Sequence, residues 1–370
     1  MAKKRYINTR DQSFFGNYIY DQMVPAKHFL RLLNQMINWD RFTDRLIEIY
    51  RGGGEYGRPP FNPSQILKMC LLANFYNLSN RQVEVHVNEN LPAKYFVGLG
   101  LDQKAPDHST LTVFRKRLTK QGNLEVFEGL LAELVQAALA AGVRFGSLQV
   151  IDSVHSIANV NTAKDERRKH EGKGPHDPDA KWGAKGKHKY KDATGKEVNQ
   201  VKYFFGYKAH VSMNAENHLI TSLEVTSGEA YDGHHFCSLV DQDLSQDIPV
   251  NTYTADRGYD DGNNHFYLEY HHLHSAICLK DIRTKKKDAN KEVWLKMIQT
   301  PAYKEGRKER YKIERKFGEA KQGHGLGRCR YIGLLGFGIQ AYFTAIILNL
   351  KRIVKLLTGV GLKTGSALAG

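Results

Sequence analysis

The sequence predicts an α/β domain, built on a mixed sheet with flanking helices, preceded by an all-helical N-terminal domain. Residues 62–141 carry helical apolar periodicity and helix start signals. The pattern changes at Gly146, where the short apolar run LQVID, residues 148–152, is typical of a strand. Strand-like and helix-like runs then alternate, which favours a sheet covered by helices.

The N-terminal helices begin at recognisable residues. Pro63 suits a first helical turn, and the run QILKMCLLANFY follows it. Ser79 and Gln82 have the spacing of a capping box, which starts a second helix after a very short turn. The pair therefore predicts a unit resembling a helix-turn-helix. The Gly-rich stretch before it, residues 51–60, predicts a loop.

A third start signal, PDHS at residues 106–109, precedes a helix that carries Arg115, Lys116 and Arg117. Two interpretations of these three cations stay open from local sequence: contact with DNA, or the solvated basic face of a packing helix. A further apolar helix over residues 124–142 closes the domain.

The order of elements after Gly146 follows from periodicity and turn residues. Residues 164–200 are basic, without apolar periodicity, and predict a long, partly flexible loop. The elements expected after it are a hairpin over 203–213 and 219–227, a helix near 232–243, a strand over 250–256, a helix to 270, a strand over 275–280 and a basic helix over 303–322.

The apolar run at residues 331–350 is nearly long enough to span a bilayer. Gln340 and Asn349 interrupt it, which favours a helix that packs in a core. The residues after Thr358 predict a flexible tail.

Composition points to a nucleic-acid partner. The net charge is +15 and the pI is about 9.4, which is the electrostatic signature of a nucleic-acid-binding protein. A basic chain that is merely soluble remains the alternative. The four cysteines form no Cys-x-x-Cys pair, and no apolar segment follows the basic N-terminal residues. We therefore expect a cytoplasmic protein without a zinc site or a signal peptide.

Two aspartates are placed for chemistry. Asp152 is predicted to end one strand, and Asp256 to end another, where Gly258 permits a sharp turn. Ligands of open α/β sheets bind at the carboxyl ends of strands. Two carboxylates there could share a magnesium ion, which prefers oxygen ligands.

A third carboxylate lies in the basic helix. Glu314 shares a stripe with Arg310 and Lys321, about 40° and 20° away at about 100° per residue. A carboxylate between two cations suits a metal ligand that faces a phosphate backbone. An ordinary Arg–Glu pair four residues apart is the alternative.

The ordered set of motifs resembles the DDE transposases of bacterial insertion sequences. It comprises Asp152 in VIDSV, Asp256 in ADRGYD and the spacing Arg310-x3-Glu314-x6-Lys321. The segments FGYKAHVS, NPSQILKMCLL, NLSNRQVE, PDHSTLTVFRKRL and GLGRCRYIGLLGF resemble the same family, so the likeness covers about residues 60–357.

The resemblance implies a ribonuclease-H-like catalytic domain over 146–357, after a DNA-binding helical domain over 1–145 and before a tail over 358–370. It implies that Asp152, Asp256 and Glu314 hold two Mg²⁺ ions, about 3.5–4 Å apart in such sites, with Mn²⁺ as a substitute. Arg310 and Lys321 would bind DNA. The partners would be the terminal inverted repeats and target DNA, with a homodimer in the complex and no membrane.

The sequence departs from the family pattern in two places. Arg307 stands where a tyrosine often precedes the arginine, and it joins the candidate DNA-binding residues. The stretch between Asp256 and Glu314 is too short for the large β insertion of some relatives. Two alternatives remain: a metal-dependent endonuclease without strand transfer, and a non-catalytic DNA-binding protein derived from a transposase.

Overall fold

The computed structural model describes residues 6, 14–47, 60–119, 124–191, 195, 197–285 and 288–362. The chain forms two compact units, Met1–Val143 with Phe343–Gly370, and Arg144–Tyr342. The first unit thus takes its last helix from the far end of the chain, which residue order alone does not indicate. The predicted loop at 51–60, apart from Pro60, and the predicted tail from 363 onward lie outside the described residues.

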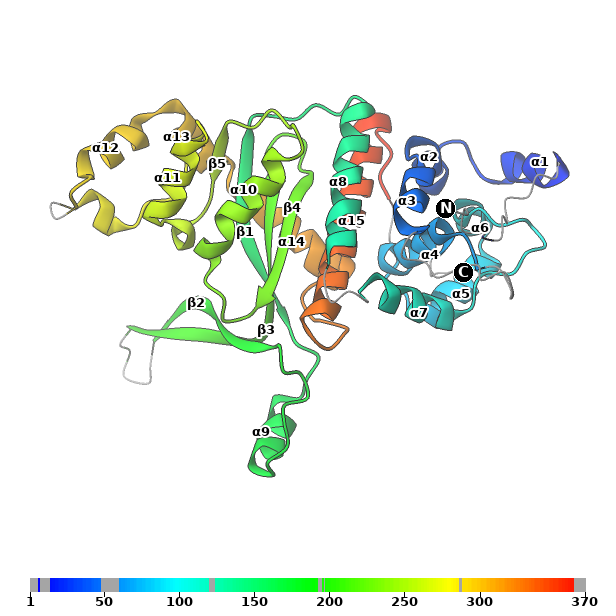
Figure 1. The fold of residues 1–370 in the computed structure, drawn as a ribbon, viewed down its shortest axis with the longest axis horizontal. Coiled ribbons are helices and arrows are strands. Elements are labelled where there is room, and N and C mark those ends of the chain that lie inside the picture. The colour runs from blue at the N-terminus through cyan, green and yellow to red at the C-terminus, as the bar shows by residue number, and fades with distance from the viewer. Residues whose placement is uncertain are drawn as a thin grey trace. The chain divides into compact units, whose positions relative to one another are not determined.

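The first unit is helical in its described parts. It contains α1 (Phe14–Met23), α2 (Phe29–Met36), α3 (Trp39–Ile47), α4 (Pro63–Phe75), α5 (Asn80–Glu89), α6 (Leu91–Val97), α7 (His108–Leu118) and α8 (Glu125–Ala140) (Figure 1). Helix α4 is buried on almost every side. It is therefore the central helix around which the others pack.

The predicted helix starts are confirmed. Pro63 opens α4, where the Asn62 side chain accepts a hydrogen bond from the Ser64 backbone. The capping box of Ser79 and Gln82 is present at α5. These caps satisfy backbone N–H groups that the first helical turn leaves without partners.

The second unit contains a mixed sheet of order β2-β3-β1-β5-β6, with β4 paired to β3. The strands are β1 (Leu148–Ile157), β2 (Lys181–Lys191), β3 (Glu197–Asn214), β4 (Ile220–Ser227), β5 (Thr252–Thr254) and β6 (His274–Ser275). The strand β1 is antiparallel to β3 and parallel to β5. The predicted α/β fold class is confirmed, and the arrangement is that of a ribonuclease-H-like fold.

Helices cover both faces of the sheet. On one face, Ile151 packs against α10 (Phe236–Leu244) and α11 (Gly262–Tyr270) in a shared apolar core. On the other face lie α13 (Pro301–Glu309) and α14 (Tyr311–His324). The α13 helix approaches closely because Gly306 has no side chain, and a Cβ there would lie 3.6 Å from a side-chain carbon of Leu148.

The prediction of a long loop over 164–200 is wrong. The segment contains α9 (Thr162–His170) and the whole of β2, which pairs with the first half of β3. Between them, buried Asp177 accepts hydrogen bonds from the Tyr207 hydroxyl and the Ala180 backbone. A lysine-rich strand that buries little apolar surface lacks the alternation by which strands are predicted.

Two other predicted elements differ in extent. The strand expected over 275–280 is reduced to β6, although the Ala276 and Cys278 backbone amides still donate to β5 and the residue after it. The basic helix is two helices that meet at Arg310, whose backbone remains helical with φ −54 and ψ −36.

The apolar run at 331–350 forms most of α15 (Leu334–Thr358). This helix is long and apolar enough to cross a membrane, but 78% of its most apolar stretch is buried inside the protein. The interrupting Gln340 is satisfied, since its side chain donates to the carbonyls of Gly325 and Arg328. These contacts support the interpretation as a core helix.

Candidate active site

The two predicted aspartates lie at the same level of the sheet. In the parallel pair of β1 and β5, Val150 is opposite Thr254. Continuing that register by two residues places Asp152 opposite Asp256, where β5 has ended. Because alternate strand residues share a face, both carboxylates belong to the face that carries α13 and α14.

Asp152 lies within β1 and does not end it, contrary to the prediction. β1 continues to Ile157 because its other edge stays paired with β3 up to Gly206. Only the pairing with β5 stops before Asp152. Asp152 therefore lies beside an unpaired edge of β1 because β5 is short, and not because β1 ends there.

The site favours the protonated form of the Asp152 carboxyl. Burial and, after it, the nearby charge of Asp256 raise the pKa of Asp152 to about 7. A hydrogen bond from the Ser153 backbone and the charge of Arg310 act in the opposite direction, and Asp232 adds a smaller upward shift. The fold thus brings carboxylates together against their mutual repulsion.

Asp256 caps the short turn that follows it. Its Oδ1 accepts a hydrogen bond from the Gly258 backbone at 2.7 Å. A Cβ on Gly258 would lie 2.9 Å from that same oxygen. Gly258 has no positive φ, so the glycine is needed for the room it leaves to the carboxylate and not for a left-handed turn.

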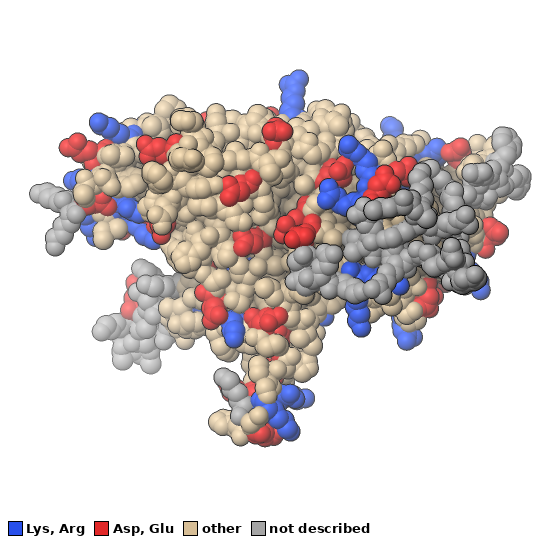
Figure 2. Space-filling view, in the orientation of Figure 1, with Lys and Arg blue, Asp and Glu red and all other residues tan. Residues whose placement is uncertain are grey.

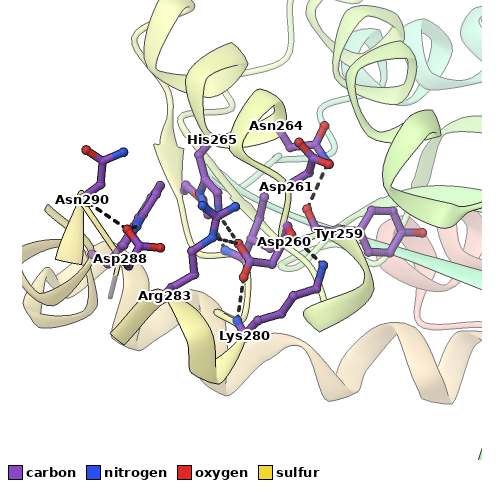
Figure 3. A network of polar contacts seen from close by, with 12 residues as sticks. Tyr259, Asp260, Asp261, Asn264, His265, Lys280, Arg283, Asp288 and Asn290 are labelled. Carbon is purple, nitrogen blue, oxygen red and sulfur yellow. Dashed lines mark hydrogen bonds and ion pairs between the residues drawn. The ribbon is translucent and has the colours of Figure 1, made fainter. Parts of the chain in front are cut away.

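The segment after Asp256 is fixed by a buried network around Asp260 (Figure 3). Its Oδ1 is 3.0 Å from His265 Nε2 and 3.3 Å from Arg283 Nε, and its Oδ2 accepts from the Lys280 backbone at 2.6 Å. Burial raises the pKa of Asp260, but these partners outweigh burial and lower it overall. The ADRGYD motif is therefore held at both ends: Asp256 accepts from the Gly258 backbone, and Asp260 is anchored in this network.

Glu314 is held near the aspartates by Arg310. The Arg310 guanidinium lies 2.7 Å from Glu314 Oε1 and 3.7 Å from Asp152 Oδ2. The ordinary Arg–Glu pair considered above therefore forms, and the same arginine also reaches Asp152. Glu314 remains about half exposed, with its carboxylate bound to Arg310.

Sequence reasoning missed Asp232, which lies near Asp152 from a different segment. Its Oδ2 accepts from the Ser153 hydroxyl at 3.0 Å, and its Oδ1 lies 2.8 Å from Lys208 Nζ. The buried Tyr259 hydroxyl lies within reach of the charges of Asp152, Asp232 and Asp256. Asp232 does not directly follow the predicted strand over 219–227 but begins the predicted helix near 232–243, so only the sheet topology could have placed it here.

Lys321 lies further along α14 beside β1. Its Nζ is 3.5 Å from Nε2 of His155. Burial and then the charges of Lys321 and Lys185 lower the pKa of His155 to about 4, so this imidazole is neutral at neutral pH. Lys321 thus lies beside β1, three residues along the strand from Asp152, and its contact with DNA stays a prediction.

The three predicted cations of α7 have different environments. Arg115 is buried and donates to Asn80, which ties α7 to α5. Lys116 is exposed and Arg117 half-buried. The structure therefore does not place Arg115 on a surface that could contact DNA. Arg307, on α13, is half-buried.

Another acidic group lies in the first unit. Among the described residues, Glu84, Asp107 and His108 have ligand atoms within 4.8 Å of one another. Both carboxylates already have structural tasks: Asp107 caps α7, and Glu84 accepts from the His108 backbone. Asp152, Asp256 and Glu314 do not meet that distance as a trio, and Glu314 is ion-paired with Arg310.

The sheet order and the helices on its two faces define a ribonuclease-H-like unit with carboxylates at the end of the parallel pair. Two family models match the chain: a Transposase domain (DUF772) over residues 18–117 and a Transposase DDE domain over residues 166–350. The second match covers half of the chain. The chain belongs to the DDE transposases, enzymes of DNA transposition in mobile elements. Asp256 and Glu314 fall inside the matched range, and Asp152 precedes it.

DDE transposase domains generally use divalent metals, and the residues present fit such an ion. The donors are carboxylate oxygens, which Mg²⁺ prefers. The pKa of Asp152 is raised partly by the charge of Asp256. A bound cation would offset this repulsion and stabilise the ionised form of both carboxylates. Arg310 is the cation that the chain itself supplies there.

Proposed function

We propose that this transposase binds the terminal inverted repeats of an insertion sequence, cuts a DNA strand at the element's end and joins the freed 3′-OH to target DNA. The observation that carries the proposal is the Asp152–Asp256 pair at the end of the parallel strands, with Glu314 held beside it by Arg310. These are the three residues that the ordered motifs select.

In this proposal Asp152, Asp256 and Glu314 hold Mg²⁺, for which Mn²⁺ can substitute. When bound, such ions lower the pKa of water and offset charge on a phosphate. The residues of the chain supply the ligands and hold them in position. Asp152 would act as a ligand in its ionised form, and Asp256 is kept in place by the Gly258 amide. Glu314 would complete the ligand set, and its partner Arg310 would then be available to bind a phosphate.

The helical domain, residues 1–145 by the sequence-based boundaries, would recognise the element's end. Lys116 supports this role by its exposure. Arg117 is only half-buried and remains a candidate, and Arg115 contributes only indirectly, by holding α7 on α5. The catalytic domain, residues 146–357, would cut and join. We infer a homodimer on DNA, because two ends must be brought together, and a cytoplasmic protein associated with the nucleoid.

Arg310, Lys321 and Arg307 are the proposed phosphate contacts near the cut. Arg310 and Lys321 share the α14 stripe with Glu314, and neither is expected to read bases, since phosphate contacts carry no sequence information. Their contribution is to hold the strand in position and to neutralise charge, which are the main ways a protein promotes this chemistry.

The test uses a plasmid that carries the DNA flanking this protein's own coding region. With Mg²⁺, the wild-type protein should nick at the element's boundaries, and a precut end with a free 3′-OH should be joined to a target plasmid. Asp256→Asn and Glu314→Gln should bind the plasmid and cut nothing. Glu84→Gln, which alters the other acidic group, is the matched control and should cut normally.

Different failures of this test have different meanings. Cutting without joining would favour an endonuclease that never transfers strands. Binding without cutting by the wild-type protein would favour a non-catalytic DNA-binding protein. Normal cutting by the Asp256 or Glu314 variant would remove that residue from the proposed site.

A further inference from the structure

The β2–β3 pair extends beyond the rest of the sheet as a two-stranded ribbon (Figure 1). The strand β1 pairs with β3 only as far as Gly206, and β4 only as far as Tyr207. Residues 197–204 of β3 pair with β2 alone. An isolated ribbon of this kind is marginal in stability by itself, and this part of it has no further strand beside it.

The ribbon is strongly basic. The β2 sequence KWGAKGKHKYK has five lysines and no acidic residue, and the paired part of β3 adds Lys202 and a single acidic residue, Glu197. Over the other elements drawn in Figure 2, basic and acidic side chains are interspersed. The ribbon is therefore a local concentration of positive charge.

An irregularity in the ribbon brings two of these lysines together. The register shifts between Ala184 and Lys187, so that Lys185 and Gly186 on β2 oppose Lys202 on β3. Gly186 adopts a φ of 87°, which glycine tolerates easily. Both lysines are exposed, and like charges placed opposite each other destabilise a sheet. Within the described part of the chain, no carboxylate lies within ion-pair distance of either lysine.

Lys185 is the ribbon lysine whose charge reaches the candidate active site. His155 on β1 is in ring contact with Phe204 of the ribbon, with centroids 4.8 Å apart, and its Nε2 is 3.5 Å from Lys321 Nζ. Burial, followed by the charge of Lys185, lowers the pKa of Lys321. Positive charges from the ribbon and from α14 thus converge a few residues along β1 from Asp152.

We propose that the β2–β3 ribbon binds duplex DNA beside the cleavage site, with Lys185 and Lys202 on backbone phosphates. A two-stranded ribbon fits the major groove of B-DNA, and converging lysines without acidic partners match a phosphate backbone. The inference rests on the proposed function, because it names a DNA contact of the same site. It assigns DNA binding to the catalytic unit in addition to the helical domain.

The opposite face of the ribbon suggests a different ligand, which the experiment can separate. Trp182 and Tyr203 are 56% and 64% exposed, and by register they share the face opposite to Phe204. Stacking on exposed aromatic rings is typical of single-strand binding. Phosphate contacts by lysines act on duplex DNA of any sequence, so the terminal repeat need not be known for the test.

The experiment measures the affinity of full-length protein for a labelled duplex of arbitrary sequence over a range of salt, without divalent metal. Each phosphate contact contributes about 0.9 to the slope of log K against log salt. The double variant Lys185→Ala/Lys202→Ala should therefore lose nearly two units of slope. Over a fourfold rise in salt, the wild-type affinity should fall roughly tenfold more than that of the variant.

Matched variants make the result specific. The pair Lys185→Arg/Lys202→Arg keeps the charge and should keep the wild-type slope. Lys296→Ala removes an exposed lysine outside the ribbon, on α12 (Lys291–Gln299), and should also leave the slope unchanged. Circular dichroism checks that each variant folds. If the alanine variant folds poorly, Lys185→Gln/Lys202→Gln, which removes both charges but keeps long polar side chains, should lose the same nearly two units of slope, and a wild-type slope in that variant would overturn the proposal.

Three outcomes would overturn the proposal. The double alanine variant could keep the wild-type slope, Lys296→Ala could lower the slope as much, or Trp182→Ala could abolish single-strand binding while the lysine variants leave duplex binding intact. Failure of the proposed function is distinguishable, since the wild-type protein would then bind duplex DNA with the expected slope but neither cut nor join it in Mg²⁺.

Discussion

Replacing Asp152 with asparagine should stabilise the metal-free protein while abolishing DNA cleavage. The folded protein raises the pKa of this carboxyl from its ordinary 3.8 to about 7, mainly by burial and by Asp256. The folded state therefore binds a proton more tightly than the unfolded state does. As pH rises from about 4 to 7, the folded state loses stability, because it must either keep the proton or accept a buried charge.

The magnitude follows from the size of the shift. At about 1.4 kcal/mol per pKa unit, a rise from 3.8 to about 7 corresponds to about 4 kcal/mol above pH 7. The asparagine side chain carries no charge and its oxygen can still accept the Ser153 amide, so the variant avoids this penalty. The gain should vanish toward pH 4, where the wild-type carboxyl is protonated in both states.

Denaturant unfolding at a series of pH values, in a chelator, measures the effect. We expect the difference between Asp152→Asn and wild type to grow from near zero at pH 4 to several kcal/mol at pH 8, and we expect added Mg²⁺ to stabilise only the wild type. A variant that is less stable than wild type at pH 8, or a difference that does not change with pH, would refute the reasoning about burial and charge repulsion.

Three further predictions concern single features. Lys321→Ala should flatten the salt dependence of duplex binding by about 0.9 and slow strand transfer with sequence preference unchanged; an unchanged slope in the binding assay would withdraw Lys321 from the DNA contacts. Gly306→Ala should lower the unfolding midpoint, since its methyl would lie 2.5 Å from a neighbouring Cβ, and overpacking costs about 1–3 kcal/mol. Gly318→Ala, with open space around it, should raise the midpoint by helix propensity, and a similar sign for both would contradict the packing argument. A 1–145 fragment should unfold at lower denaturant than the same fragment linked to Phe343–Gly370; equal stability would contradict the observed unit.

The dependence of the first unit on the end of the chain has a physical basis. Phe343 packs against Phe127 of α8 with ring centroids 5.4 Å apart, and Ile346 and Leu350 lie beside apolar residues of α3, α4 and α8. Periodicity identified the final helix as apolar and as a core element. It could not identify which core the helix enters, because that depends on contacts between residues far apart in sequence.

Local signals predicted the helix starts well, since a cap depends on residues only a few positions apart. Pro63, Ser79 and Gln82 are cases where the chemistry of one turn determines the boundary. The β2 strand is the opposite case. Its lysines and glycines give no apolar alternation, and the strand exists because β3 offers it a row of backbone hydrogen bonds.

The candidate site was predictable in residue identity but not in environment. The motifs selected Asp152, Asp256 and Glu314, and helix geometry placed Arg310 and Glu314 on one stripe. The sequence did not indicate Asp232, because a lone aspartate in a connection gives no signal until the sheet brings its hydrogen-bond partner Ser153 beside it. The exclusion of Arg115 from the surface likewise depends on tertiary packing between α5 and α7.

The central claim is that these three carboxylates hold the metal ions. Binding of Mn²⁺, followed by electron paramagnetic resonance, tests it most directly, because it needs neither the terminal repeat nor strand transfer. Asp152→Asn, Asp256→Asn and Glu314→Gln should each weaken Mn²⁺ binding strongly, while Glu84→Gln should leave it at the wild-type level. Loss of binding in the Glu84 variant, with normal binding in the other three, would contradict the account and place the metal in the helical unit.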